Sequence, residues 1–210
     1  PASTLLHLGP GLANGLANIH NARRASSGMV NVVGEHSTSH LQYDPPLKSD
    51  IQGLARPLSH WVRQSDSAGA IAQDTADAVA VANGHPGQIA TLILPGDCSW
   101  QDAGNVALPA RAPRQMKAPD VKNIDAIAQI LKSGEPAMLI LANKGARGKA
   151  LALAGKVGAA TGCRLGSQFF TNRLERGAGD FRAASLNYDH ASGRAEFGGP
   201  QRVVLPPRTP

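Results

Sequence analysis

Short runs of leucine and β-branched residues alternate with longer alanine-rich runs in the first half of the sequence. The pattern predicts strand Thr4–Leu8, helix Gly11–Ala25, strand Met29–Val33, a long loop, helix Ser67–Asn83 and strand Ile89–Leu94. Strands that alternate with helices are typical of α/β proteins with mainly parallel sheets. We therefore expect an α/β fold whose sheets are flanked by helices.

The second half repeats this alternation. It predicts helix Ile124–Leu131, strand Ala137–Ala142, helix Lys149–Ala160, strand Cys163–Ser167 and a last strand Arg202–Leu205. Gly134 and Gly162 follow the two helices, as expected of residues that end a helix. Residues 176–200 contain too few apolar residues for an assignment.

Charge divides the 210 residues into two parts. Residues 1–101 carry 5 basic and 7 acidic side chains, whereas residues 102–210 carry 16 and 8. Between them, residues 102–119 contain three prolines and no apolar period, which is typical of an extended linker. We therefore predict a first domain at 1–101, a linker at 102–119 and a second domain at 120–210.

Composition excludes several classes of protein. Apolar residues make up 42% of the chain and charged residues 17%, which fits neither a disordered chain nor a membrane protein. No run approaches the length of a membrane span, and residues 1–6 lack the features of a signal peptide. Cys98 and Cys163 are widely separated, which suits a cytoplasmic protein without disulfides. The chain begins almost directly in an apolar run, and we expect it to be part of a longer protein.

The segment Leu5–Gly15 is the best candidate for a ligand site. An apolar strand passes through Gly9-Pro10-Gly11 into a helix, whose first amides carry a partial positive charge. Such a turn at the carboxyl end of a strand is a natural place for a ligand. Glycine and proline are also the usual residues of an ordinary strand–helix turn, so both interpretations stay open.

Four blocks of sequence carry a resemblance to a known family. They are the Leu-His-x-Gly-Pro-Gly-x-x-Asn-Gly run with Asn21–Ala25, then Val30–His36, Asp50–Pro57 and Gly84–Asp97. In this order they resemble the thiamine diphosphate-dependent enzymes of the acetolactate synthase and benzoylformate decarboxylase type. The resemblance implies a partial pyrimidine-binding domain, and Gly134–Gly162 is similar to the Rossmann-like central domain that follows it.

Individual site residues follow only from this resemblance. His7 matches the position where the decarboxylases carry an active-site histidine, which handles a proton or orients the substrate. Gly9, Pro10, Gly11 and Asn14 match the segment that binds the aminopyrimidine ring of the cofactor. Gln42 corresponds less closely to a glutamine on the substrate side. A histidine of the strand with a purely structural role is the alternative for His7.

The resemblance also implies which groups the chain lacks. The family's cofactor-activating glutamate would precede Pro1, and its Gly-Asp-Gly magnesium and diphosphate motif would follow Pro210. We therefore expect thiamine diphosphate and Mg²⁺ in the full-length enzyme, no stable cofactor on this chain alone, and no activity of this chain alone. Flavin adenine dinucleotide in the central domain stays open, and the basic turn Lys144–Lys149 is the place where its phosphate could lie.

Other chemistries have weaker support. His36 and His40 suggest a metal pair, but no third ligand has a fixed spacing, so we expect no metal site. Aromatic residues are not interleaved with the cations of the second half, so we expect no nucleic acid partner and, from the hydropathy, no membrane partner. The family resemblance implies decarboxylation of a 2-oxo acid, with or without carboligation, in a homodimer or homotetramer. The alternative is a truncated, non-catalytic protein of the same fold that binds a nucleotide or a partner.

Overall fold

A computed structural model describes residues 1–106, 118–168, 171 and 173–175, together with the backbone of four short strands between residues 184 and 204. The chain divides into two compact units, Pro1–Met116 and Lys117–Pro210. Most of the expected linker, residues 107–117, lies outside the described residues.

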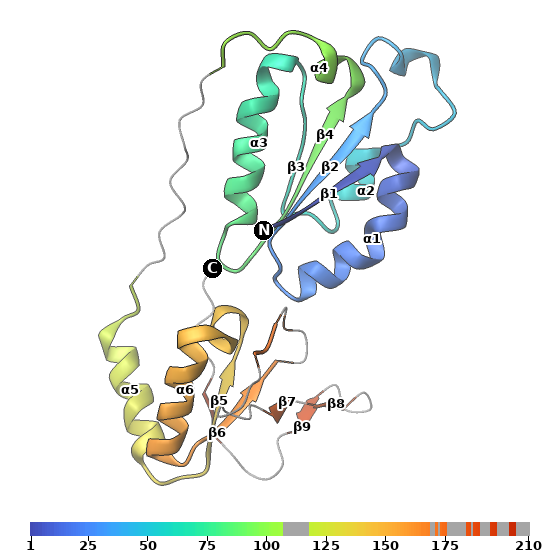
Figure 1. The fold of residues 1–210 in the computed structure, drawn as a ribbon. Coiled ribbons are helices and arrows are strands. Elements are labelled where there is room, and N and C mark those ends of the chain that lie inside the picture. Colours follow the sequence, from blue (N-terminus) through green and yellow to red (C-terminus); the bar gives the residue numbers. More distant parts are fainter. Residues whose placement is uncertain are drawn as a thin grey trace. The chain divides into compact units, whose positions relative to one another are not determined.

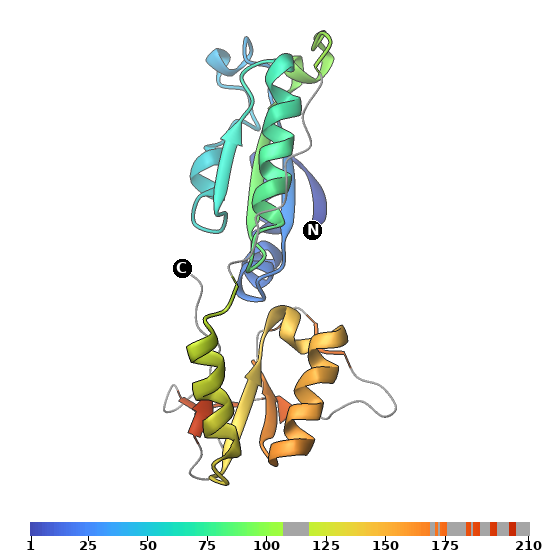
Figure 2. The ribbon, with the colours of Figure 1, turned by 90° about the vertical axis from the view of Figure 1, so that its left-hand side faces the viewer.

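The first unit is a parallel sheet with helices on both faces (Figures 1 and 2). Its elements are β1 (Ala2–His7), α1 (Leu8–Arg24), β2 (Met29–Glu35), a 3-10 turn η1 (Leu41–Tyr43), α2 (Ile51–Ala55), β3 (Trp61–Gln64), α3 (Ala68–Ala82), β4 (Ile89–Pro95) and α4 (Gly96–Trp100). The strands lie in the order β1-β2-β4-β3 and every pair is parallel. The predicted α/β class with parallel sheets is confirmed.

Two apolar layers hold the sheet between its helices. On one face Val33 and Ile93 pack with Leu12 and Ile19 of α1 and with Ile51 of α2. On the other face Val30 and Ala90 pack against Ala78 and Ala82 of α3. Successive side chains of a strand point to opposite faces, so residues of one parity line one layer. Leu6 belongs to the α1 layer, whereas Leu5 and His7 point to the opposite face of β1, where Leu5 is 82% exposed.

A row of polar side chains crosses the middle of the α1 layer. The hydroxyl of Thr4 donates to Asn31 Oδ1 at 2.7 Å, and Asn31 Nδ2 donates to Thr91 Oγ1 at 3.3 Å. Thr91 Oγ1 also lies 2.8 Å from the hydroxyl of Ser59. Asn31 and Thr91 are both 0% exposed, so their polar atoms depend on these bonds. The row links strands β1, β2 and β4.

Two expectations for the first unit are wrong. The first helix begins at Leu8 and not at Gly11, because proline is accepted in the first turn of a helix, where its missing N–H has no intrahelical acceptor. The long loop before Ser67 contains α2 and β3. Both are too short to show an apolar period: α2 has five residues and depends on its Asp50 cap, and β3 is a four-residue edge strand.

The second unit contains α5 (Val121–Lys132), β5 (Ala137–Leu141), a 3-10 turn η2 (Asn143–Ala146), α6 (Gly148–Thr161), β6 (Arg164–Ser167), β7 (Ala184–Ser185), β8 (Asn187–Asp189), β9 (Arg194–Glu196) and β10 (Arg202–Val204). A parallel sheet has the order β10-β5-β6-β7, and β8 pairs with β9 in an antiparallel ladder. Leu131, Leu141, Leu151 and Leu165 form its core. Gly162 follows α6 at φ 71°, as predicted for a residue that ends a helix. The unassigned segment 176–200 contains β7, β8 and β9.

Among the described helices, none is long and apolar enough to cross a membrane.

Candidate ligand site

All four strands of the first sheet end at the same edge. Strand register places His7 opposite Gly34, Glu35 opposite Pro95, and Gln64 opposite Ile93. After β2 the chain turns to α2, which contacts α1, whereas after the neighbouring strand β4 it turns to α4, which contacts α3. The connections thus leave two adjacent strands toward opposite faces of the sheet. In open α/β sheets this position at the carboxyl edge is where ligands bind.

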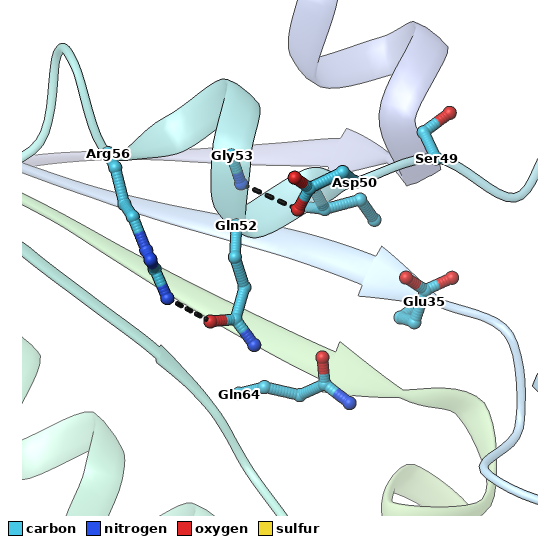
Figure 3. Close-up of a pocket in the computed structure, with 8 residues that line it drawn as sticks. Glu35, Ser49, Asp50, Gln52, Gly53, Arg56 and Gln64 are labelled. Carbon is cyan, nitrogen blue, oxygen red and sulfur yellow. Dashed lines mark hydrogen bonds between the residues drawn. The ribbon is translucent and has the colours of Figure 1, made fainter.

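A polar pocket of about 270 Å³ lies at this edge (Figure 3). It is lined by the last residues of β2 and β3 and by residues of α2 and on either side of it, namely Glu35, Gln64, Ser49, Asp50, Ile51, Gln52, Gly53 and Arg56. The volume suits a small molecule or one ring of a larger molecule, because pockets for complete drug-sized ligands are generally larger.

Glu35 is the most buried ionisable side chain of the pocket. It is 9% exposed and lies on the same face of the sheet as Val33, beneath α2. Its Oε1 accepts a hydrogen bond from the backbone amide of His36 at 2.7 Å. A buried carboxylate needs hydrogen-bond donors around it, so a ligand that donates a hydrogen bond would be favoured beside Glu35.

The α2 side of the pocket is ordered by its own hydrogen bonds. The Asp50 side chain caps α2 by accepting from the amide of Gly53 at 2.7 Å, and Arg56 donates to Gln52 Oε1 at 3.0 Å (Figure 3). These bonds engage the Asp50 carboxylate and Gln52 Oε1, and they leave the amide nitrogen of Gln52 and the amide of Gln64 at the pocket wall. The pocket therefore combines the buried Glu35 carboxylate with neutral amides and, on its α2 side, with the charged groups of Asp50 and Arg56.

Gly9, one of the predicted site residues, packs against the lining of this pocket. It is buried in the first turn of α1, after Leu8, whose φ of 54° turns the chain from β1 into the helix. A Cβ at Gly9 would lie 2.2 Å from the hydroxyl oxygen of Ser49, which lines the pocket. The absence of a side chain at Gly9 thus lets α1 approach the segment that leads into α2.

The other predicted residues are not part of the pocket lining. His7 is exposed at the same edge but on the other face of β1, and Pro10 and Asn14 are exposed on α1. Gly11 is half-buried and a Cβ there would meet only ordinary contacts, the nearest at 3.4 Å from Leu6. Gln42 is exposed in η1, where its side chain donates to the carbonyl of Ser39 at 2.9 Å.

The loop after β2 is hydrogen-bonded to the residues that follow β4. Thr38 donates to Asp97 twice, from its amide at 3.0 Å and from its hydroxyl at 2.5 Å. These bonds from Thr38 lower the pKa of the Asp97 carboxyl. Within this loop the rings of His36 and His40 lie 5.8 Å apart, and His36 Nε2 is buried without a hydrogen-bond partner among the described residues. No three metal-ligating side chains gather within the described part of the chain.

Glu35, Ser49 and Gln64 had no predicted role in a site. Glu35 ends an apolar strand, and a polar residue in that position is a usable signal for the carboxyl edge of a sheet. Gln64 gave no comparable signal because β3 was not predicted.

Comparison with known proteins links the chain to one enzyme group. No protein-family model matches the chain. A Mycobacterium tuberculosis protein named "Putative acetolactate synthase large subunit IlvX" is 45% identical over 205 residues, which cover 98% of this chain and 39% of that protein. The chain thus spans less than half the length of this relative.

Solved structures of low identity have the same fold. Benzoylformate decarboxylase of Polynucleobacter necessarius has a TM-score of 0.71 and 20% identity, over 82% of this chain and 32% of that one. A thiamine diphosphate-dependent 4-hydroxybenzoylformate decarboxylase of Rhodococcus jostii RHA1 has a TM-score of 0.66 and 18% identity, over 98% of this chain and 36% of that one. The predicted resemblance is confirmed: the chain is similar to part of the thiamine diphosphate-dependent enzymes of the acetolactate synthase and benzoylformate decarboxylase type.

Proposed function

We propose that the chain is part of a thiamine diphosphate-dependent enzyme that acts on a 2-oxo acid, either as a decarboxylase or as an acetolactate synthase-like enzyme. Residues 1–101 would be a partial pyrimidine domain, 102–119 the linker and 120–210 a partial central domain. The observation that carries the proposal is the polar pocket at the carboxyl edge of the first sheet, between strands whose connections leave in opposite directions. The similarity over 98% of the chain supports it.

The hydrogen-bonding groups of the pocket fit an aminopyrimidine ring. Such a ring has an amino group that donates and ring nitrogens that accept hydrogen bonds. The Glu35 carboxylate can accept from the amino group, and the amides of Gln52 and Gln64 can donate to a ring nitrogen. When bound, the cofactor supplies the electron sink for decarboxylation. The residues of the pocket hold and orient the ring.

The diphosphate and Mg²⁺ have no matching set of ligands in the described residues. Among these residues, no three histidine, cysteine, aspartate or glutamate side chains lie close enough together to hold a metal ion. His7 remains the residue that we propose for proton transfer or for orienting the substrate carboxylate, because an imidazole can do both near neutral pH. Its place at the end of β1 puts it on the same edge as the pocket.

The family resemblance is also the basis for three further expectations. We infer a homodimeric or homotetrameric assembly, Mg²⁺ as the ion that accompanies the diphosphate, and a cytoplasmic location. Both cysteines, Cys98 and Cys163, are free and buried, which is consistent with a cytoplasmic location.

A titration of the ¹⁵N-labelled chain with 4-amino-2-methylpyrimidine tests the use of the pocket. We expect amide shifts at Gly9, Glu35 and Gln64, and loss of these shifts in Glu35→Gln, which removes the negative charge and keeps the size. The matched control is Asp44→Asn, since the Asp44 side chain is 88% exposed and lies outside the pocket lining. Absence of shifts at this edge, or shifts that Glu35→Gln leaves unchanged, would refute the proposal and favour the non-catalytic nucleotide- or partner-binding alternative.

A further inference from the structure

The beginning of α6 in the second unit resembles a phosphate site by its position. Strand β5 ends at Leu141, the turn η2 follows, and α6 begins at Gly148. A helix that begins after the carboxyl end of a parallel strand offers its free amides to anions, and dinucleotide phosphates bind in such places. The basic turn Lys144–Lys149 was accordingly the expected place for a flavin phosphate.

A carboxylate of the chain itself already lies at this helix end. Glu175 Oε2 accepts a hydrogen bond from the backbone amide of Gly148 at 2.5 Å, and the backbone amide of Glu175 donates to the carbonyl of Ala146 at 3.3 Å. Side chain and main chain of one residue are thus both tied to the turn that precedes α6. The Glu175 side chain is 35% exposed and also lies 3.3 Å from Arg173.

The segment that carries Glu175 is anchored in the core. Leu174, the preceding residue, packs against the cluster that contains Leu141 of β5 and Leu151 of α6. Partial burial of this leucine holds the neighbouring glutamate near the helix end, so the position of the carboxylate does not depend on its side-chain contacts alone. Leu174 and the amide of Glu175 together keep the carboxylate at the α6 amides.

The glycines of the turn do not form a cradle for a phosphate. A Cβ at Gly145 or at Gly148 would meet no atom within 4 Å. Gly148 has a φ of 54°, a conformation that favours glycine, so the backbone conformation alone accounts for this residue. A phosphate at the α6 end would also meet the negative charge of Glu175, which repels a second anion at hydrogen-bond distance. The residues present therefore do not fit the diphosphate of a flavin dinucleotide at this place.

We propose that the Glu175 carboxylate occupies the anion position at the N-terminal end of α6. The second unit therefore does not bind flavin adenine dinucleotide through the amides of this helix. The role of Glu175 is to position the turn: its carboxylate replaces an external phosphate as the partner of the Gly148 amide. Glu175 belongs to the second unit, whereas the residues that line the pocket all belong to the first.

Amide spectra of the 210-residue chain test the contact directly. In the wild type we expect the Gly148 amide resonance to be protected from exchange and insensitive to added inorganic phosphate. In Glu175→Ala the protection should be lost, and phosphate should shift the Gly148 resonance in a saturable manner. Glu175→Gln keeps a hydrogen-bond acceptor without the charge and should retain most of the protection, so it tests the contact should the alanine variant fail to fold. Asp125→Ala, which removes an exposed carboxylate of α5, is the matched control and should behave as the wild type.

Flavin fluorescence provides the second measurement. Free flavin adenine dinucleotide titrated with the wild-type chain should show no saturable change in emission. Saturable binding by the wild type would overturn the proposal. An unprotected Gly148 amide in the wild type, or a phosphate response that is the same in the wild type and Glu175→Ala, would overturn it as well.

Discussion

Replacement of Gly9 by alanine tests whether close packing at the start of α1 explains this glycine. The added Cβ would lie 2.2 Å from Ser49 Oγ and 2.3 Å from Ser49 Cβ, distances that real contacts do not show. The Cα of Ser49 lies 3.7 Å away, which is an ordinary contact. The conflict therefore involves only the Ser49 side chain, and it should disappear when Ser49 is replaced by glycine.

The expected magnitudes follow from these distances. Overpacking of a close contact costs about 1 to 3 kcal/mol, whereas alanine in place of glycine gains up to about 1 kcal/mol of helix propensity. Gly9→Ala should thus lower the free energy of unfolding by about 1 to 2 kcal/mol. Ser49→Gly loses one 3.4 Å hydrogen bond to Leu47 and should cost less than about 1 kcal/mol. The double variant should be about as stable as Ser49→Gly alone.

Urea unfolding followed by tryptophan fluorescence measures this, because Trp61 and Trp100 both lie in the first unit. With an m-value of about 1.5 kcal/mol per M, the Gly9→Ala midpoint should fall by about 0.7 to 1.3 M. Gly11→Ala is the matched control: its Cβ would meet only ordinary contacts, and the variant should be as stable as the wild type or slightly more stable. Additive effects of Gly9→Ala and Ser49→Gly would refute the packing explanation.

Two further predictions concern carboxylates of the first unit. Asp74 is 5% exposed and accepts hydrogen bonds from Arg63 at 2.7 Å and from the buried hydroxyl of Ser65 at 2.8 Å. In urea unfolding, Asp74→Ala should therefore lower the free energy of unfolding by about 2 to 3 kcal/mol, and Ser65→Ala by only about 1 kcal/mol. Equal costs for the two variants would show that the Arg63 bond contributes nothing. The hydrogen bonds from Thr38 lower the pKa of Asp97 in the folded chain. The ionised Asp97 therefore stabilises the fold above its unfolded pKa of about 4, and this stabilisation is lost as the pH falls through the folded pKa. The urea midpoint of the wild type should therefore fall more steeply than that of Asp97→Asn between about pH 5 and pH 2, and parallel curves would contradict this role.

Long elements of the fold could be predicted from the sequence. Helix α3 and strand β4 show enough alanine or β-branched residues in one run for the pattern to be clear, and their observed bounds, Ala68–Ala82 and Ile89–Pro95, lie close to the predicted ones. Short elements could not be predicted, because α2 depends on its Asp50 cap and β3 on its pairing with β4. Local sequence carries no period over four or five residues.

The pocket depends on the same distant pairing. Glu35 and Gln64 are far apart in sequence, and only the register of β2 and β3 on β4 brings their side chains to one edge. The family resemblance singled out the segment that contains Gly9, and the structure places Gly9 against Ser49 of the pocket lining, a neighbour that sequence alone could not show. The roles of His7, Pro10, Gly11, Asn14 and Gln42 remain predictions.

The buried row of Thr4, Asn31 and Thr91 has a consequence for how the chain finds its native state. A strand that slips by one residue turns Asn31 to the α3 layer and Val30 or Val32 toward Thr4 and Thr91, so every polar atom of the row loses its partner at once. A misaligned sheet is therefore destabilised by unpaired polar atoms in its interior, away from the carboxyl edge. Hydrogen bonds of Asn31 and Thr91, four residues before Glu35 and Pro95, thereby fix the alignment of these two residues at the edge where the pocket lies.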